Sequence, residues 1–536
     1  RREILSLTSY ISSNYLHGRC ELVVRGSGID PGETARAVDW VRRVLESPYW
    51  QTDDALRLRD VVDHQMSAIS GFRQAGYEEF WDRELAHAYA RQDNPLLLST
   101  NCFLTLYFHL QRLRWQLKGG IDLCDRKQFC QFFSFLADNA RGLSRAQLNR
   151  LLLDLRKVDF VFKQSSAGSG EVSALYRKAG VKANGLSPVA RALTADAASD
   201  IGQNLLDIPD DSLEQDWRTV CNQLVFDISV TPQKALERLH EVRRKLLVSG
   251  GCRMFVTGSS KTIAAVQPEI DKLIGILKEA PVCPVNYGER RRVDERLQKR
   301  TGETGRPVYV GLLHPNTHQG VIMNSVPAIR YTDASEESLL RYLATQLYSG
   351  CGARSMYMKT WAAGLAYGNG LDQRPDETLQ YYADKVPALP DTIRFVNAQL
   401  KSARRDSQLT EYAIAQVFWS WAAGRYESRG EAMADSLADG VTPDLVREFH
   451  RRIMKLRKRE GLSDELYARM IPEYAQVLPG LSSEAKLPAG SVNFIIGDQN
   501  QFALYEDYLK SSVDASARLY RLLGRDFWLL PDKLIN

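Results

Sequence analysis

The sequence lacks the cysteine and hydrophobic patterns that mark several large classes of protein. The eight cysteines are Cys20, Cys102, Cys124, Cys130, Cys221, Cys252, Cys283 and Cys351. No two of them form a C-x-x-C pair, which disfavours a structural zinc knuckle or a small disulfide scaffold. No stretch approaches the ~20 consecutive apolar residues that cross a bilayer. We therefore expect no membrane insertion, and a soluble compartment that the sequence leaves unidentified.

The amino terminus has no signal-peptide pattern. It reads Arg1-Arg2-Glu3 and has no initiator Met. This start suggests a processed product, a trimmed chain or the later part of a longer polypeptide.

An excess of charge of one sign is also missing. The chain has 70 Lys and Arg against 65 Asp and Glu, well mixed, for a net charge of +5. No basic stripe is available to follow phosphates, so we expect no nucleic-acid partner. The basic runs Arg290–Arg292 and Lys455–Arg459 are interpreted as solvated surfaces that could touch an acidic partner.

The length predicts more than one hydrophobic core. Single cores stop growing at roughly 250 to 300 residues, and this chain has 536 residues with 44% apolar composition. We predict a first domain over 1–280, with an exposed insertion at about 165–211 that begins in a Ser- and Gly-rich patch. A Pro-, Gly- and charge-rich linker over 281–305 then leads to a second domain over 306–536.

Both halves mix strand and helix patterns. Strands are predicted at Cys20–Arg25 and Cys252–Val256 in the first half, and over 308–313, 321–326 and 492–497 in the second. Amphipathic helices separate them. This order predicts an α+β protein with two related domains, each an antiparallel-rich sheet covered by helices.

The most informative segment is Gly364-Leu-Ala-Tyr-Gly-Asn-Gly370, which a predicted helix and Gly350-Cys-Gly-Ala-Arg354 precede. It resembles the G-L-A-Y-S segment of C-terminal domains in the pitrilysin and insulinase family of metallopeptidases. The closing Leu523-Gly-Arg-Asp-Phe-Trp528 resembles the R-D-F-W ending of related proteins. Leu22-Val-Val-Arg-Gly26 and the two helical patterns after it are similar to the third domain of presequence proteases. The resemblance covers most of the chain except 165–211.

The resemblance implies two of the four homologous α/β-roll domains that form a clamshell in this family. The family's first domain carries the zinc motif H-x-x-E-H and a downstream Glu. None of the eight histidines here completes that motif: His17, His64, His87, His109, His240, His314, His318 and His450. A hydrolytic zinc needs three protein ligands, so we expect no cofactor in this chain and zinc in a separate catalytic half. Alone, the chain is predicted to be inactive.

His314-Pro-Asn-Thr-His318 is the one closely spaced histidine pair that we considered as a metal site. Pro315 and Asn316 disfavour a helical ligand face, and no carboxylate is at hand. We therefore predict a loop without metal.

Two residues are predicted from the resemblance to act on a substrate. Active relatives present an Arg and a Tyr to the substrate, and Tyr367 matches the Tyr of the G-L-A-Y segment. A phenol can donate a hydrogen bond to an oxygen that develops charge during peptide hydrolysis. No Arg follows Arg354 in this stretch, so Lys359 is the substitute cation, as a point charge without the planar fork of Arg. Simple packing of the Tyr367 ring beside a strand is the alternative.

Two functions follow from these expectations. In the first, the chain is the non-catalytic half of a zinc-dependent, peptide-degrading endopeptidase. It encloses unfolded peptide with a zinc-bearing half, which is either part of the same polypeptide or a separate subunit. In the second, it is a degenerate peptidase homologue that acts as a structural or binding subunit without proteolytic activity. An exposed inner face would also favour homo-association.

Overall fold

The computed structural model describes residues 6–50, 55–74, 78–157, 170–281, 290–304, 307–314, 317, 319–373, 375, 378–422, 426–483 and 487–529. These residues form many helices, one two-stranded sheet and one six-stranded sheet. The predicted α+β class is confirmed. No helix in these ranges has the length and apolar content needed to cross a membrane.

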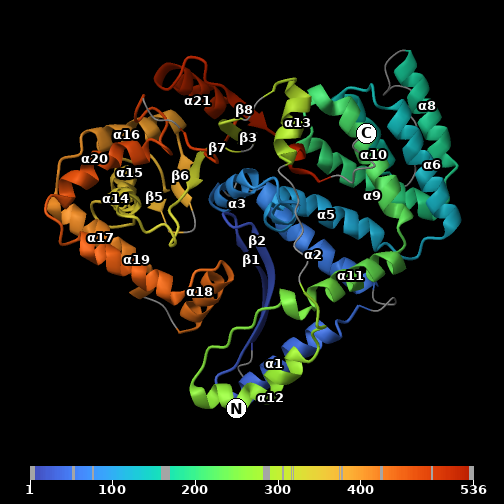
Figure 1. Ribbon diagram of the computed structural model, residues 1–536. Coiled ribbons are helices and arrows are strands. Elements are labelled where there is room, and N and C mark those ends of the chain that lie inside the picture. The colour runs from blue at the N-terminus through green and yellow to red at the C-terminus, as the bar shows by residue number, and fades with distance from the viewer. Residues whose placement is uncertain are drawn as a thin grey trace.

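The six-stranded sheet belongs to the C-terminal half (Figure 1). Its order is β5-β6-β4-β7-β3-β8, and its strands are β3 (Tyr309–Leu313), β4 (Gly320–Pro327), β5 (Gly368–Gln373), β6 (Thr378–Val386), β7 (Val492–Gly497) and β8 (Leu519–Leu522). The first four strands of that order pair antiparallel, while β3 runs parallel to β7 and β8. The strands predicted over 308–313, 321–326 and 492–497 are confirmed within one or two residues.

One face of this sheet is covered by helices of the same half. They are α14 (Glu336–Thr345), α16 (Leu389–Lys401), α17 (Ser407–Ala422), α19 (Pro443–Leu456), α20 (Leu462–Tyr474) and α21 (Gln499–Ser512). Side chains of a strand alternate between the two faces. On β7, Ile495 accordingly packs into this core, whereas Phe494 and Ile496 point to the opposite face.

The opposite face is covered by helices from earlier in the chain. These are α3 (Glu78–Ala90), α4 (Pro95–Asn101) and α13 (Arg292–Thr301). Tyr89 of α3 packs its ring against Phe494, with centroids 5.9 Å apart. Val293 and Leu297 of α13, inside the range predicted as a linker, are buried in the same core. The two halves therefore share one hydrophobic core, and the division near residues 281–305 stays a prediction.

A second large core is entirely helical. It lies among α5 (Phe103–Gln116), α6 (Leu123–Asn139), α7 (Arg145–Leu155), α8 (Glu171–Asn184), α9 (Pro188–Asn204) and α10 (Leu213–Ser229). Its members include Leu193, Ala197 and Ile201, which lie within the stretch predicted as an exposed insertion. The helices in the described part of that stretch bury one face in this core, where small residues let neighbouring helices pack closely, while Val181 and Leu206 are each 74% exposed. Residues 158–169, with all of the Ser- and Gly-rich patch except Gly170, lie outside the described residues.

The N-terminal segment forms an arm below these cores (Figure 1). It contains the hairpin β1 (Ser6–Asn14) and β2 (Arg19–Ser27), followed by α1 (Pro31–Glu46) and α2 (Ala55–Gln74), with α11 (Pro232–Leu246) and α12 (Ser260–Ile274) packed nearby. The strand predicted at Cys20–Arg25 is confirmed as part of β2. The strand predicted at Cys252–Val256 is wrong. Those residues form no ladder, and their side chains, including Met254 and Phe255, stay exposed.

The hairpin is fastened to α18 (Tyr426–Ala438) and the turn after it. The Tyr10 hydroxyl donates to Glu431, and Ser12 Oγ donates to Asp435 Oδ1 over 2.9 Å. Asn14 Nδ2 donates to Asp439 Oδ2 over 2.8 Å. The three acidic residues are four positions apart, about one turn of a helix, and their partners on β1 are two positions apart, the repeat of side chains on one face of a strand. Successive turns of α18 and the residues after it therefore meet successive side chains on one face of β1. Burial, together with Glu431, raises the pKa of Tyr10 to about 12, so its phenol remains a donor.

The C-terminal Arg525-Asp526-Phe527-Trp528 joins the two large cores. Trp528 stacks on Phe108 of the helical core, with centroids 4.7 Å apart, while Phe527 lies in the core shared with the sheet. Arg525 pairs with Asp216 of α10, and Arg300 Nη2 of α13 donates to Asp526 Oδ2 over 3.0 Å. The segment that resembles a family ending is therefore a structural joint.

Candidate functional site

Tyr367 lies in the turn between α15 (Met356–Ala362) and β5. The Ser355 hydroxyl accepts a hydrogen bond from the Met358 amide and caps the start of α15. The helix ends at Ala362, and two residues later Gly364 has a φ of +70°, in the left-handed region that glycine occupies without strain. The chain then enters β5, which lies at one edge of the six-stranded sheet.

The ring of Tyr367 is not packed into a core. Tyr367 is 62% exposed, whereas its neighbour Ala366 is buried. Much of this residue is therefore open to solvent, and packing of its ring beside a strand stays the alternative. Whether the hydroxyl acts on a substrate stays a prediction.

An irregularity in β6 lies directly beside Tyr367. Between the pairs Gly320–Val386 and Ile322–Ala383, β4 has one residue and β6 has two, Asp384 and Lys385. This is a β-bulge, a feature that redirects side chains and is frequent next to active sites. Lys385 has a φ of +49° and is the only residue other than glycine with a positive φ in the described part of the chain.

The bulge holds the backbone of the Tyr367 segment. The Tyr367 amide donates to the Asp384 carbonyl over 3.2 Å, and the Gly368 amide donates to Asp384 Oδ1 over 2.7 Å. A Cβ on Gly368 would lie 2.4 Å from the Asp384 carboxylate, so this approach requires glycine. The Lys385 ammonium nitrogen lies over the Tyr367 ring, 4.4 Å from its centroid.

Lys359, the predicted substitute cation, has other neighbours. Its Nζ donates to Gln399 Oε1 of α16 over 3.3 Å and lies 5.9 Å from the ring centroid of Tyr348. The structure therefore places Lys385 against the Tyr367 ring and Lys359 against α16. The role predicted for Lys359 stays a prediction.

A break in periodicity was the sequence signal for Lys385. Leu379, Tyr381 and Ala383 alternate into one core, and continuing that alternation would bury Lys385. Val386 takes that core position instead. The sequence pattern therefore allowed the inference of a one-residue shift in register at Asp384–Lys385. It did not show that Lys385 contacts Tyr367.

His314 lies at the same end of the sheet, after β3, and its Nδ1 is 2.8 Å from Thr317 Oγ1. Three strands separate β3 from β5, so His314 and Tyr367 are roughly 19 Å apart at about 4.8 Å per strand. They do not share a site. His318 lies outside the described residues. Within the described ranges, no group of three or more His, Cys, Asp or Glu side chains could hold a metal ion.

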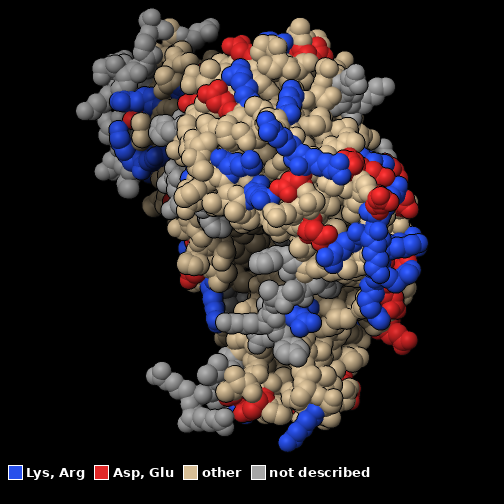
Figure 2. Space-filling model, turned by 90° about the vertical axis from the view of Figure 1, so that its left-hand side faces the viewer, with Lys and Arg blue, Asp and Glu red and all other residues tan. Residues whose placement is uncertain are grey.

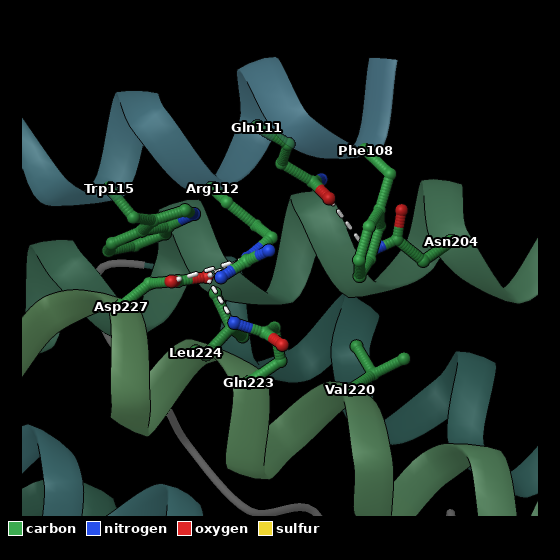
Figure 3. A pocket seen from close by; sticks show the side chains of 9 residues that line it. All are labelled: Phe108, Gln111, Arg112, Trp115, Asn204, Val220, Gln223, Leu224 and Asp227. Atoms are coloured by element: carbon green, nitrogen blue, oxygen red, sulfur yellow. Dashed lines mark hydrogen bonds and ion pairs between the residues drawn. The ribbon is translucent and has the colours of Figure 1, made fainter. Parts of the chain in front are cut away.

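A small cavity lies inside the helical core (Figure 3). Its free volume is about 10 Å³, enough for one water molecule. Two buried amide atoms that line it, Gln111 Nε2 and Gln223 Oε1, have no protein partner. Asp227 accepts from Gln223 over 2.8 Å and pairs with Arg112 at 3.4 Å, and burial raises the pKa of Asp227. The cavity is too small for a peptide.

A larger hollow lies on the surface between the N-terminal ends of α17 and α20. Its volume is about 310 Å³, and its lining includes Arg457 and Arg459 of the basic run predicted to be solvated. Both are ion-paired, Arg457 with Glu411 at 2.9 Å and Arg459 with Glu465 at 2.7 Å. Figure 2 shows Lys, Arg, Asp and Glu interspersed on this side of the molecule. The run is thus a mixed-charge surface.

The comparisons with known proteins give similar solved structures but no matching family. No family model matches the chain, and no curated protein matches it. Among solved structures, the chain is similar to a peptidase M16 inactive domain from Pseudomonas fluorescens, with 12% sequence identity and a TM-score of 0.31. The match covers 49% of this chain and 57% of that one, less than two thirds of its length.

Proposed function

We propose that this chain is the non-catalytic half of a zinc-dependent, peptide-degrading endopeptidase that resembles presequence proteases. It would enclose unfolded peptide together with a zinc-bearing half. The observation that carries this proposal is the exposure of Tyr367, 62%, in the segment with the family resemblance. The exposed side chain is accessible to a ligand.

The proposal includes two homologous α/β rolls. In the described residues, the C-terminal half supplies a helix-covered six-stranded sheet, whereas the N-terminal half supplies the β1–β2 hairpin. The idea of a second roll therefore rests on the sequence resemblance around Leu22–Gly26.

Tyr367 would act by hydrogen bonding. Its hydroxyl would donate to the carbonyl oxygen of the scissile peptide bond as that oxygen gains negative charge. One such donor is worth about 3 kcal/mol, or 10²- to 10³-fold in kcat, in comparable sites. Zinc in the catalytic half would supply the activated water, and the present chain would position the peptide and exclude bulk solvent.

The second candidate function is a structural or binding subunit without proteolytic activity. The position of Lys359 favours it, because its Nζ contacts Gln399 of α16 instead of Tyr367. The Arg that active relatives place near their tyrosine thus has no counterpart at the predicted position.

Hydrolysis of an internally quenched peptide by the assembled protein, purified with its zinc-bearing half, tests the proposal. Tyr367→Phe should lower kcat by roughly 10²-fold or more, because it removes only the hydroxyl donor. Tyr49→Phe is the matched control, since Tyr49 is 60% exposed and lies on the arm. Equal rates for both variants would rule out the role of Tyr367. An assembled wild type that binds the peptide without cutting it would favour the second function.

A further inference from the structure

We propose that Lys385 is a second donor at the Tyr367 site, and that its ammonium group and the Tyr367 hydroxyl bind one negatively charged group of a peptide. The inference deepens the proposed function and rests on it for the identity of the ligand. It starts from the backbone, because three unusual features coincide at this residue.

The first two features are the bulge and the left-handed conformation. In bulges of this kind a left-handed position is usually glycine, since an L-residue meets a steric cost that glycine avoids. Lys385 is the one non-glycine residue with positive φ in the described ranges, at +49°. Backbone strain of this sort persists where the surrounding structure enforces it, and it clusters at functional sites.

The third feature is where the bulge directs the side chain. Without it, the alternation of Leu379, Tyr381 and Ala383 would carry Lys385 into the core. With it, the ammonium nitrogen lies 4.4 Å from the centroid of an exposed aromatic ring. Without the bulge, the Lys385 ammonium would be buried in the core. With the bulge, it lies beside the phenol ring of Tyr367.

The Tyr367 backbone is fixed to the same bulge. Asp384 accepts from the Tyr367 amide through its carbonyl and from the Gly368 amide through its carboxylate, at 3.2 and 2.7 Å. The backbones of the two residues are therefore fixed relative to each other at the end of the sheet. Fixing the backbones reduces the conformational freedom that the pair loses on binding, which favours a preorganised site.

The ligand class follows from the chemistry of the pair. An ammonium and a phenol O–H both donate, so together they suit an oxygen that carries negative charge. The ammonium lies over the ring face and the hydroxyl lies at the ring edge, so the two donors can hold one anionic group that carries two oxygens. Two sources present such a group: the tetrahedral oxyanion of peptide hydrolysis and the carboxylate at a peptide C-terminus.

Binding of two fluorescent peptides to the full 536-residue chain tests the inference by anisotropy. One peptide has an internal phosphinate as the oxyanion mimic and an amidated C-terminus. The other has ordinary peptide bonds and a free C-terminal carboxylate. Lys385→Met should weaken the binding of at least one of them roughly 10- to 100-fold, as expected for a lost charged hydrogen bond. The peptide that responds identifies the source.

Lys182→Met is the matched control, because Lys182 of α8 also lies near an aromatic ring, 5.0 Å from the centroid of Phe135. It should leave both affinities unchanged. Lys385→Gly separates strain from function: it should raise the melting temperature, since glycine tolerates the left-handed position, and still weaken binding as much as Lys385→Met. If Lys385 had only a structural role, Lys385→Gly would not raise the melting temperature and weaken peptide binding at the same time.

Three results would overturn the inference. They are no binding of either peptide by the wild-type chain, equal losses in the Lys385 and Lys182 variants, and full affinity in Lys385→Gly. Failure of the proposed function has a different signature. If the assembled wild-type protein cuts no peptide while Lys385→Met still loses binding, the donor pair stands and serves the second, non-proteolytic function.

Discussion

Replacing Asp526 by Asn should destabilise the whole chain, because this carboxylate lies where both large cores meet. Its side chain is fully buried and accepts from Arg300 Nη2 at 3.0 Å and from the Leu523 amide at 2.9 Å. Arg525 Nη1 lies 3.4 Å from its other oxygen. Asn has nearly the same shape but no charge. The variant therefore leaves Arg300, whose side chain is 8% exposed, without a compensating anion.

The expected loss is large relative to the usual stability of a folded protein. Removing one partner of a buried ion pair costs about 3 to 5 kcal/mol, against a total of about 5 to 15 kcal/mol for a typical domain. Unfolding entropy of about 2.1 cal/mol/K per residue gives about 1.1 kcal/mol/K for 536 residues, if they unfold together. The melting temperature should then fall by roughly 3 to 5 °C.

Thermal and urea unfolding, followed by far-UV circular dichroism and tryptophan fluorescence, measure this loss. Fluorescence adds local information because Trp528 stacks on Phe108 next to the mutated residue. Asp138→Asn is the control, since its pair with Arg218 is exposed on both sides and worth at most about 1 kcal/mol. If Asp526→Asn costs no more than Asp138→Asn, the joint does not stabilise the contact between the cores.

Two further predictions concern pH and the arm. Burial, followed by the nearby Arg112, lowers the pKa of His109 to about 4. The unfolded chain therefore binds an extra proton below about pH 6.5, and up to about 3 kcal/mol of stability should disappear as the pH falls from 6.5 to 4. His109→Gln should flatten that part of the pH profile of urea unfolding, and an unchanged slope would contradict the assignment. Arg19 Nε donates to Asp439 Oδ1 over 2.6 Å, with both side chains 9% exposed. Asp439→Asn should therefore speed amide hydrogen exchange in β1 and β2 while exchange in β7 stays slow, and equal exchange in β1 before and after the change would show that the contact does not hold the arm.

The sequence predicted the strands of the large sheet because their apolar runs are local signals. Val492–Gly497 is buried along its whole length, as a run of Val, Phe and Ile interrupted only by Asn493 indicates. The segment Cys252–Val256 also contains apolar residues but pairs with no strand among the described residues. Composition specifies what a segment can do, whereas pairing depends on the rest of the fold.

The core that the two halves share could not be predicted from sequence patterns, because these patterns describe only local structure. Leu85 and Tyr89 mark an apolar helix face, but nothing local shows that this face covers a sheet formed more than 200 residues later. The small residues of α9 likewise fit both an exposed segment and a tightly packed helix. Only the contacts of Ala197 and Ile201 decide between them.

The candidate site was predictable in part. Tyr367 could be selected from the G-L-A-Y segment, and its exposure agrees with a role at the surface of a binding site. Lys359 was selected from spacing along the chain, whereas the residue over the ring is Lys385, which comes from a different strand. Cross-strand neighbours depend on register, and here a bulge sets that register.

Hydrolysis of an internally quenched peptide by three samples tests the central claim most directly: this chain alone with added zinc, the zinc-bearing half alone, and their equimolar mixture. We predict that only the mixture cuts the peptide at an appreciable rate. Cleavage by this chain alone, or a mixture no faster than the zinc-bearing half, would contradict the account.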